Sequence, residues 1–140
     1  MQPTISTSPV VSIETDHRFL RRVLIVDGLF CAITGIDMVV FAQPTATFLG
    51  VDQPFAIMLI GLALLAVSAF IFLTLRAKPL PAASIRLLVG GNVAWVVSSF
   101  ALLVADMSLL SNGGKLAIVV QAFLTADVAF FEWMGWRRGR

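Results

Sequence analysis

Four long apolar segments recur along this sequence, and they constrain its fold more than any other feature. They cover residues 20–42, 54–75, 85–106 and 116–136. A helix of about 21 to 23 residues, rising 1.5 Å per residue, spans roughly 30 to 35 Å. That length crosses the hydrocarbon core of a bilayer, which is about 30 Å thick. The segments therefore predict four membrane-spanning helices.

The composition indicates a chain solvated mainly by lipid. Hydrophobic residues make up 59% of the 140 residues and charged residues 13%, and the mean hydropathy is +0.95. A soluble domain is roughly one half apolar and one quarter charged, and a chain this small would leave much apolar surface in water. We therefore expect an all-α, four-helix transmembrane bundle with up-down-up-down topology that binds no nucleic acid.

The connecting segments contain residues that end or redirect helices. None of the six prolines lies in the interior of an apolar segment, where proline would break a helix. Residues 45–51 are a candidate interfacial helix, and residues 111–114 (Ser-Asn-Gly-Gly) indicate a turn. Residues 1–17 are rich in Ser, Thr and Pro, so we expect a flexible cytoplasmic tail followed by one transmembrane domain over residues 18–140.

A cleaved signal peptide is the alternative interpretation of the first apolar segment, because Arg18, Arg21 and Arg22 precede it. The segment is about twice the length of a signal-peptide apolar region, and no small-x-small cleavage site follows it. We therefore expect a retained helix. Four retained helices place both termini on the same side of the membrane.

The basic residues predict which side that is. Nine of the ten lie at the start of the first segment, around the connection between the second and third, or after the fourth, whereas Lys115 is the exception. Cytoplasmic loops carry an excess of Lys and Arg, so we expect both termini in the cytoplasm. Some of these residues form a candidate interfacial basic rim for anionic lipid headgroups. They are Arg21, Arg22, Arg86, Arg137 and Arg138.

Small residues recur at spacings of three, four or seven within each apolar segment, as in Gly28, Ala32 and Gly35 or Gly90, Ala94 and Ala101. In lipid, helices associate through close packing of such residues. No strict GxxxG motif occurs within a segment, so the pattern favours packing within one bundle over a dedicated dimer motif.

Polar and acidic side chains within the apolar segments are the candidate functional residues. A charged carboxylate at a helix centre costs about 2.5 to 3.5 kcal/mol on insertion scales, so such groups are expected to face other protein, pair or take up a proton. The candidate intramembrane polar cluster contains Asp27, Thr34, Asp37, Asn92, Ser99, Gln121, Asp127 and Glu132.

Depth along the helices predicts how this cluster is arranged. Asp27, Asn92 and Asp127 lie roughly 10 to 13 Å from the cytoplasmic ends of their helices, so they are expected to meet in one layer, with Asp27 bonded to Asn92. Glu132 is shallower, within reach of an arginine. Helical phase places Asp127 about 120° from Glu132, so these two acids are expected to face different neighbours.

Three interpretations of these polar residues stay open. The first is an interior hydrogen-bond network that holds the helices together. In the second, Asp27 and Asp127 titrate during proton-coupled or cation transport, because burial favours the protonated carboxyl group. In the third, the basic rim binds lipid or a small ligand.

The sequence offers little for other chemistry. Cys31 and His17 are the sole cysteine and histidine, so a CxxC pair, a haem site within the bundle, a serine triad and a His/Cys metal site are all unsupported. We therefore expect no enzyme active site, no cofactor and no metal.

The segment Phe19–Gly28 and the element Gly91-Asn92-Val93-Ala94-Trp95-Val96 resemble small bacterial integral membrane proteins of unknown function with four predicted spans. The resemblance implies a bacterial inner-membrane location and a compact helical bundle, and it implies no activity. We expect a structural or accessory protein in the lipid bilayer that packs against a membrane-protein partner or itself as a homo-oligomer. The alternative is a small oligomeric proton-coupled transporter that uses Asp27.

Overall fold

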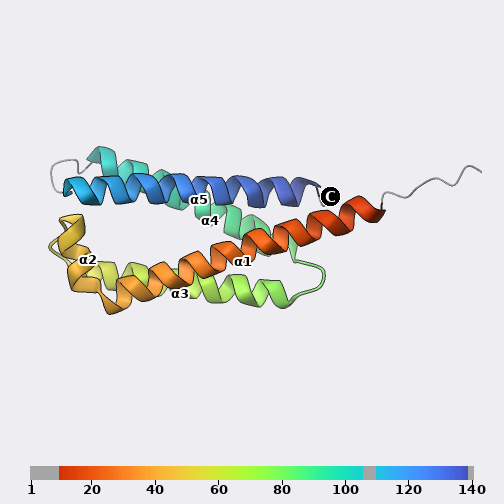
Figure 1. The fold of residues 1–140 in the computed structure, drawn as a ribbon, viewed down its shortest axis with the longest axis horizontal. Coiled ribbons are helices and arrows are strands. Elements are labelled where there is room, and N and C mark those ends of the chain that lie inside the picture. Colours follow the sequence, from red (N-terminus) through yellow and green to blue (C-terminus); the bar gives the residue numbers. More distant parts are fainter. Residues whose placement is uncertain (1–9, 106–109, 139–140) are drawn as a thin grey trace, which may run out of the picture.

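A computed structural model describes residues 10–105 and 110–138, and within these ranges the chain forms five helices (Figure 1). Four helices are long and apolar enough to cross a membrane: α1 (Val10–Val40), α3 (Pro54–Arg76), α4 (Ala82–Ala105) and α5 (Asn112–Arg138). The short helix α2 (Ala42–Leu49) connects α1 to α3. The predicted all-α class and four-helix bundle are confirmed.

Two helix boundaries differ from those expected. Helix α1 begins at Val10, so residues 10–17, expected in a flexible tail, are helical, and residues 1–9 lie outside the described residues. Asn112 begins α5, so residues 112–114 of the expected turn form the first turn of the helix, and Ser111 directly precedes it. Asp106, expected at the end of the third span, also lies outside the described residues.

Helix α2 overlaps the short helix expected at residues 45–51, but it begins three residues earlier, at Ala42. It ends at Gly50, whose φ of 80° lies in the left-handed region that glycine adopts at helix ends. The backbone N–H of Ser111 donates to the carbonyl of Leu49 at 3.0 Å, which ties the end of α2 to the start of α5.

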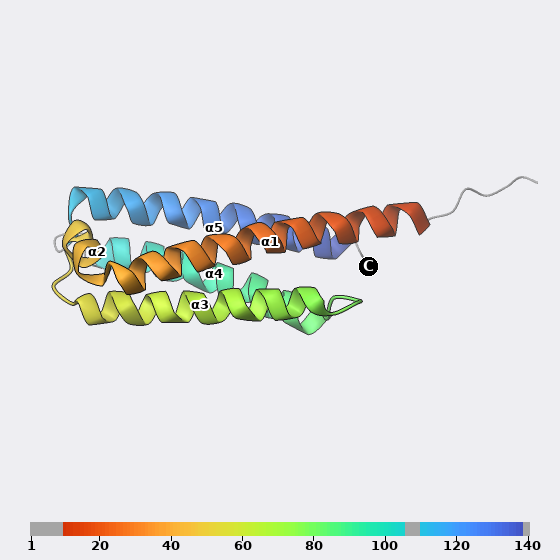
Figure 2. The ribbon, with the colours of Figure 1, turned by 60° about the horizontal axis from the view of Figure 1, so that its bottom comes forward.

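The long helices form two pairs, α1 with α3 and α4 with α5, and α1 also packs on α5 (Figures 1 and 2). Helices α3 and α4 are not closely packed against each other. The first turn of α1 and the last turn of α5 lie at one end of the molecule, and α2 lies at the other. A cluster of buried apolar residues joins the two pairs near the end opposite α2. It contains Leu20, Leu24, Ile71, Leu80, Ile85 and Leu88.

Glycines bring α1 and α3 into close contact. A Cβ added to Gly35 would lie 2.8 Å from the carbonyl oxygen of Gly61, and a Cβ added to Gly61 would lie 2.8 Å from that of Gly35. By contrast, a Cβ on Gly90 or Gly91 of α4 would have no neighbour within 4 Å. The expected small-residue packing therefore occurs between α1 and α3, but these two glycines of α4 do not take part in it.

Candidate functional site

Asp27 is a buried carboxylate within α1, with 3% of its surface exposed. Its Oδ1 faces the thiol of Cys31, one helical turn later, with a sulfur–oxygen distance of 3.9 Å. Its Oδ2 is buried and accepts no hydrogen bond from another described residue. Buried polar atoms in proteins are nearly always hydrogen-bonded, so this free oxygen marks a place where a donor can bind.

Glu132 of α5 is the second buried acid, and none of its surface is exposed. Its Oε2 accepts a hydrogen bond of 3.1 Å from Nδ2 of Asn92 on α4, while its Oε1 is buried without a partner. Asp27 and Glu132 lie close enough for their charges to interact. The two acids and the amide therefore form one group contributed by three helices.

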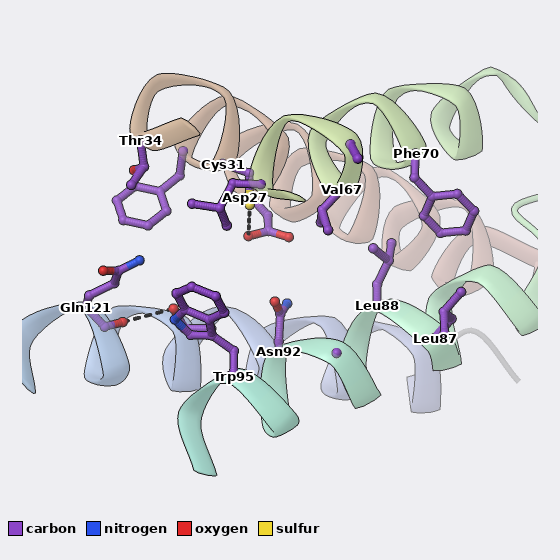
Figure 3. A pocket seen from close by; sticks show the side chains of 15 residues that line it. Asp27, Cys31, Thr34, Val67, Phe70, Leu87, Leu88, Asn92, Trp95 and Gln121 are labelled. Atoms are coloured by element: carbon purple, nitrogen blue, oxygen red, sulfur yellow. Dashed lines mark hydrogen bonds between the residues drawn. The ribbon is translucent and has the colours of Figure 1, made fainter. Parts of the chain in front are cut away.

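This arrangement differs from the predicted one. Asn92 donates to Glu132, whereas the sequence predicted that an arginine would pair with Glu132. The predicted interaction of Asn92 with Asp27 is present as well. The amide of Asn92 also points toward Asp27 (Figure 3). Glu132 follows the buried Thr125 by seven residues. This spacing returns it to nearly the same face of α5 and turns it into the bundle.

Asp127 does not join this group. Its side chain is exposed on the outer surface of α5, while Ala129, two residues later, is buried. The predicted layer of Asp27, Asn92 and Asp127 is therefore wrong, because depth alone does not decide which way a side chain points. The predicted divergence between Asp127 and Glu132 is present.

The carboxylate of Asp27 points into a cavity of about 440 Å³ between the two helix pairs (Figure 3). Neutral polar side chains lie near the acid, and aliphatic and aromatic ones form the remaining walls. Asp27 is the sole acid among the described residues that line this cavity, and no basic residue is among them. The cavity lining includes Asn92, Trp95, Gln121, Val67, Leu87 and Gly91.

A second cavity, of about 880 Å³, continues the first toward α2. Trp95 and Gln121 line both cavities, so the two adjoin at these side chains. Phe41 and Phe48 line the second cavity near α2. Together the cavities form a cleft that runs between the helix pairs, with the carboxylate of Asp27 in its smaller part.

The smaller cavity opens sideways between α3 and α4. Val67 of α3 is 38% exposed and Leu87 of α4 is 65% exposed, and both line the cavity. Because these two helices are apolar and span-length, the opening faces the acyl chains of a surrounding bilayer.

Four of the other predicted polar residues also line the cleft. Thr34 and Gln121 line the smaller cavity, and Asp37 and Ser99 line the larger one. The Ser99 hydroxyl donates to the carbonyl of Trp95 in its own helix at 2.8 Å. Except for Asp127 and Glu132, the predicted polar cluster thus lines the cleft, although its members are spread along it.

Arg21, one of the predicted rim residues, binds the end of α3. Its guanidinium donates to the carbonyls of Leu75 at 2.7 Å and Ala77 at 2.6 Å, at the end of α3. The last carbonyls of a helix lack partners within that helix. Arg21 therefore caps α3, whereas its neighbour Arg22 is exposed.

Two further rim arginines, Arg86 and Arg137, lie against tryptophans. The guanidinium of Arg86 is 5.9 Å from the ring centre of Trp136, and that of Arg137 is 4.9 Å from the ring centre of Trp133. Both are cation–π distances. The side chain of Arg138 lies outside the described residues.

Two contributors to the site were not identified from the sequence. The buried hydroxyl of Ser68 on α3 donates to the carbonyl of Gly28 on α1 at 2.8 Å, which fixes α3 beside the turn that carries Asp27. Trp95 forms part of both cavities. Ser68 is one of the small residues of its apolar segment, and Trp95 lies one turn after Asn92, but neither signal indicated a cavity.

These features define a small multi-pass membrane protein with an acid-lined cleft between two helix pairs. Comparison with protein families, with curated proteins and with solved structures finds no match for this chain.

Proposed function

We propose that this protein binds a small amphipathic molecule in the cleft between its helix pairs, and that Asp27 binds the polar end. The observation that carries the proposal is the carboxylate of Asp27, which is 3% exposed, has one oxygen without a partner and lines the 440 Å³ cavity. Small-molecule sites typically occupy about 300 to 1,000 Å³ and are apolar, with a few convergent polar groups. The cavity matches both criteria.

The energetics support this role. Placing a carboxylate within a membrane span costs about 2.5 to 3.5 kcal/mol on insertion scales. The described neighbours of Asp27, a thiol and an amide, are neutral at neutral pH and leave Oδ2 unbonded. A ligand that donates a hydrogen bond to this oxygen offsets part of that cost, which would link binding to stability.

Energy transfer from Trp95 to the neutral, membrane-soluble fluorophore N-phenyl-1-naphthylamine tests the proposal in vesicles. Specific binding gives transfer that saturates, whereas simple partitioning gives transfer that rises in proportion to the probe. Gly91 lines the cavity and its neighbour Gly90 does not, yet both have free space around a Cβ. Gly91→Phe should therefore abolish the saturable component and Gly90→Phe should retain it. Equal effects of the two substitutions would contradict the proposal.

If the bound molecule also crosses the membrane, the protein is a transporter. This possibility corresponds to the proton-coupled transporter considered from the sequence. The cleft supports it because it extends along the helices from Asp27 to the residues beside α2. In proteoliposomes, Asp27→Asn should abolish proton-coupled flux while the protein still folds. Wild-type protein that moves none of several cations and drugs would rule transport out.

An accessory role is the second candidate, favoured by a different observation. Gly90 and Asp127 lie on outer surfaces of the helix pair α4–α5, where a small residue and an acid serve little purpose against lipid. This role predicts a partner that stays bound in mild detergent and is lost from Asp127→Leu. An isolated monomer from native membranes would count against it.

We also propose that both termini face the cytoplasm, in a bacterial inner membrane. The described basic residues near the spans support this orientation, because all except Lys115 belong to the end of the molecule that holds the last turn of α5. The bacterial location rests on the resemblance stated above.

A further inference from the structure

The free oxygens of the site require a donor. Oδ2 of Asp27 and Oε1 of Glu132 are both buried and unbonded, and the two carboxyl groups come from α1 and α5. Helix α4 adds Asn92, a neutral amide, and α3 adds the Ser68 hydroxyl, which is already used by the carbonyl of Gly28. No described basic side chain lines the cavity. A donor to these oxygens therefore comes from outside the described residues that line the cavity.

The walls of the cleft require an apolar body on the same ligand. Beyond Asp27 the cavities are lined mainly by aliphatic and aromatic side chains and meet at Trp95. Asp37, on the larger cavity, follows Asp27 by ten residues on α1, which corresponds to about 15 Å along the helix. The cleft is thus long, and its buried carboxylate with a free oxygen lies in the smaller part.

We propose that the ligand is a single-chain amphiphile with a protonated amine head, which binds with the head at Asp27 and the chain along the cleft toward α2. This inference rests on the proposed function and names its ligand class. An ammonium group carries three donors and one positive charge, so it satisfies Oδ2 of Asp27 and offsets the acidic charge of the site. The side opening between Val67 and Leu87 admits the chain from the bilayer.

Other amphiphiles of the same length fit the site less well. A fatty acid brings a third carboxylate beside Asp27 and Glu132, and like charges in a medium of low dielectric repel strongly. An alcohol offers one donor and no charge. The proposed order of affinity is therefore amine, then alcohol, then acid.

The test uses dodecylamine, dodecanol and dodecanoate as probes. Full-length protein with Trp133→Phe and Trp136→Phe retains Trp95 as its sole tryptophan, and it is reconstituted in vesicles of phosphatidylcholine with brominated acyl chains. The bromines quench Trp95, and a ligand in the cleft should relieve the quenching in a saturable way. We expect dodecylamine to bind about tenfold more tightly than dodecanol, as a hydrogen bond to a charged group implies, and dodecanoate not to bind.

Asp27→Asn should weaken dodecylamine binding about tenfold and leave dodecanol binding nearly unchanged. Asp127→Asn is the matched control, because it removes an exposed acid outside both cavities, and it should leave both affinities unchanged. Protection of Cys31, the sole cysteine, from alkylation by N-ethylmaleimide gives a second measurement in protein that keeps all three tryptophans.

The outcomes separate the two proposals. Saturable binding in which dodecanol or dodecanoate matches dodecylamine, or in which Asp27→Asn has no effect, would overturn the amine class and leave cleft binding intact. If no probe relieves the quenching or protects Cys31, and the neutral fluorophore also fails to saturate, then both proposals fail.

Discussion

Nδ2 of Asn92 on α4 donates to Oε2 of Glu132 on α5 at 3.1 Å, and this bond joins the second helix pair at the level of the buried acids. Glu132, the acceptor of this bond, has no exposed surface. The geometry makes Asn92 sensitive to charge, because its neighbours on both sides are acids.

Two substitutions test this relationship: one converts the amide to a carboxyl group, and the other converts the carboxyl group to an amide. Asn92→Asp removes the donor and adds a third acid, so it should lower the free energy of unfolding by roughly 1 to 3 kcal/mol at neutral pH. Glu132→Gln keeps an acceptor for Asn92 and replaces a buried ionisable group by a neutral one of the same shape, so it should be neutral or stabilising. Unfolding by SDS titration measures both. Acidic pH should restore part of the stability of Asn92→Asp, since protonated acids do not repel, and a defect independent of pH would contradict this explanation.

The close contact between α1 and α3 predicts that one added methyl group there lowers the stability of the protein. Gly61→Ala places a Cβ 2.8 Å from the carbonyl of Gly35, so the helices must separate, at a cost of about 1 to 3 kcal/mol. Gly90→Ala makes the same chemical change in open space and should leave the unfolding midpoint unchanged or raise it. Equal midpoints for the two variants would show that α1 and α3 do not approach this closely.

The cap on α3 predicts a difference between adjacent arginines. Arg21→Gln removes the guanidinium that bonds the carbonyls of Leu75 and Ala77, and it should destabilise the protein by about 1.5 to 3 kcal/mol. Arg22→Gln removes the same charge from an exposed position, so its effect should stay within about 0.5 kcal/mol. Thermal unfolding in detergent distinguishes the two, and similar losses would indicate a general effect of charge.

The proposed orientation is tested by reporters fused after residue 140. Green fluorescent protein at this position should fluoresce and alkaline phosphatase should be inactive, because the basic residues keep this end in the cytoplasm. The reverse pattern should hold for reporters fused at Gly50, at the end of α2. An active phosphatase after residue 140 would refute the assignment.

The sequence predicted the fold class and most of the residues around the cleft. Apolar length alone placed the four spans, because each must match the thickness of a bilayer. It also placed Asp27, Asn92 and Glu132 among the polar residues of the spans. It did not predict the cleft, since a cavity arises from two helices that fail to pack together, here α3 and α4.

Amino-acid sequence by itself thus determined how many helices cross the membrane and where the costly acids lie along them. Only the tertiary structure decided that Glu132 and not Asp127 faces inward, and that Gly61 packs while Gly90 does not. The physical reason is the solvent: lipid is as apolar as the protein interior, so hydropathy does not distinguish the inner face of a helix from its outer face. The choice depends on side-chain fit and hydrogen bonding between helices.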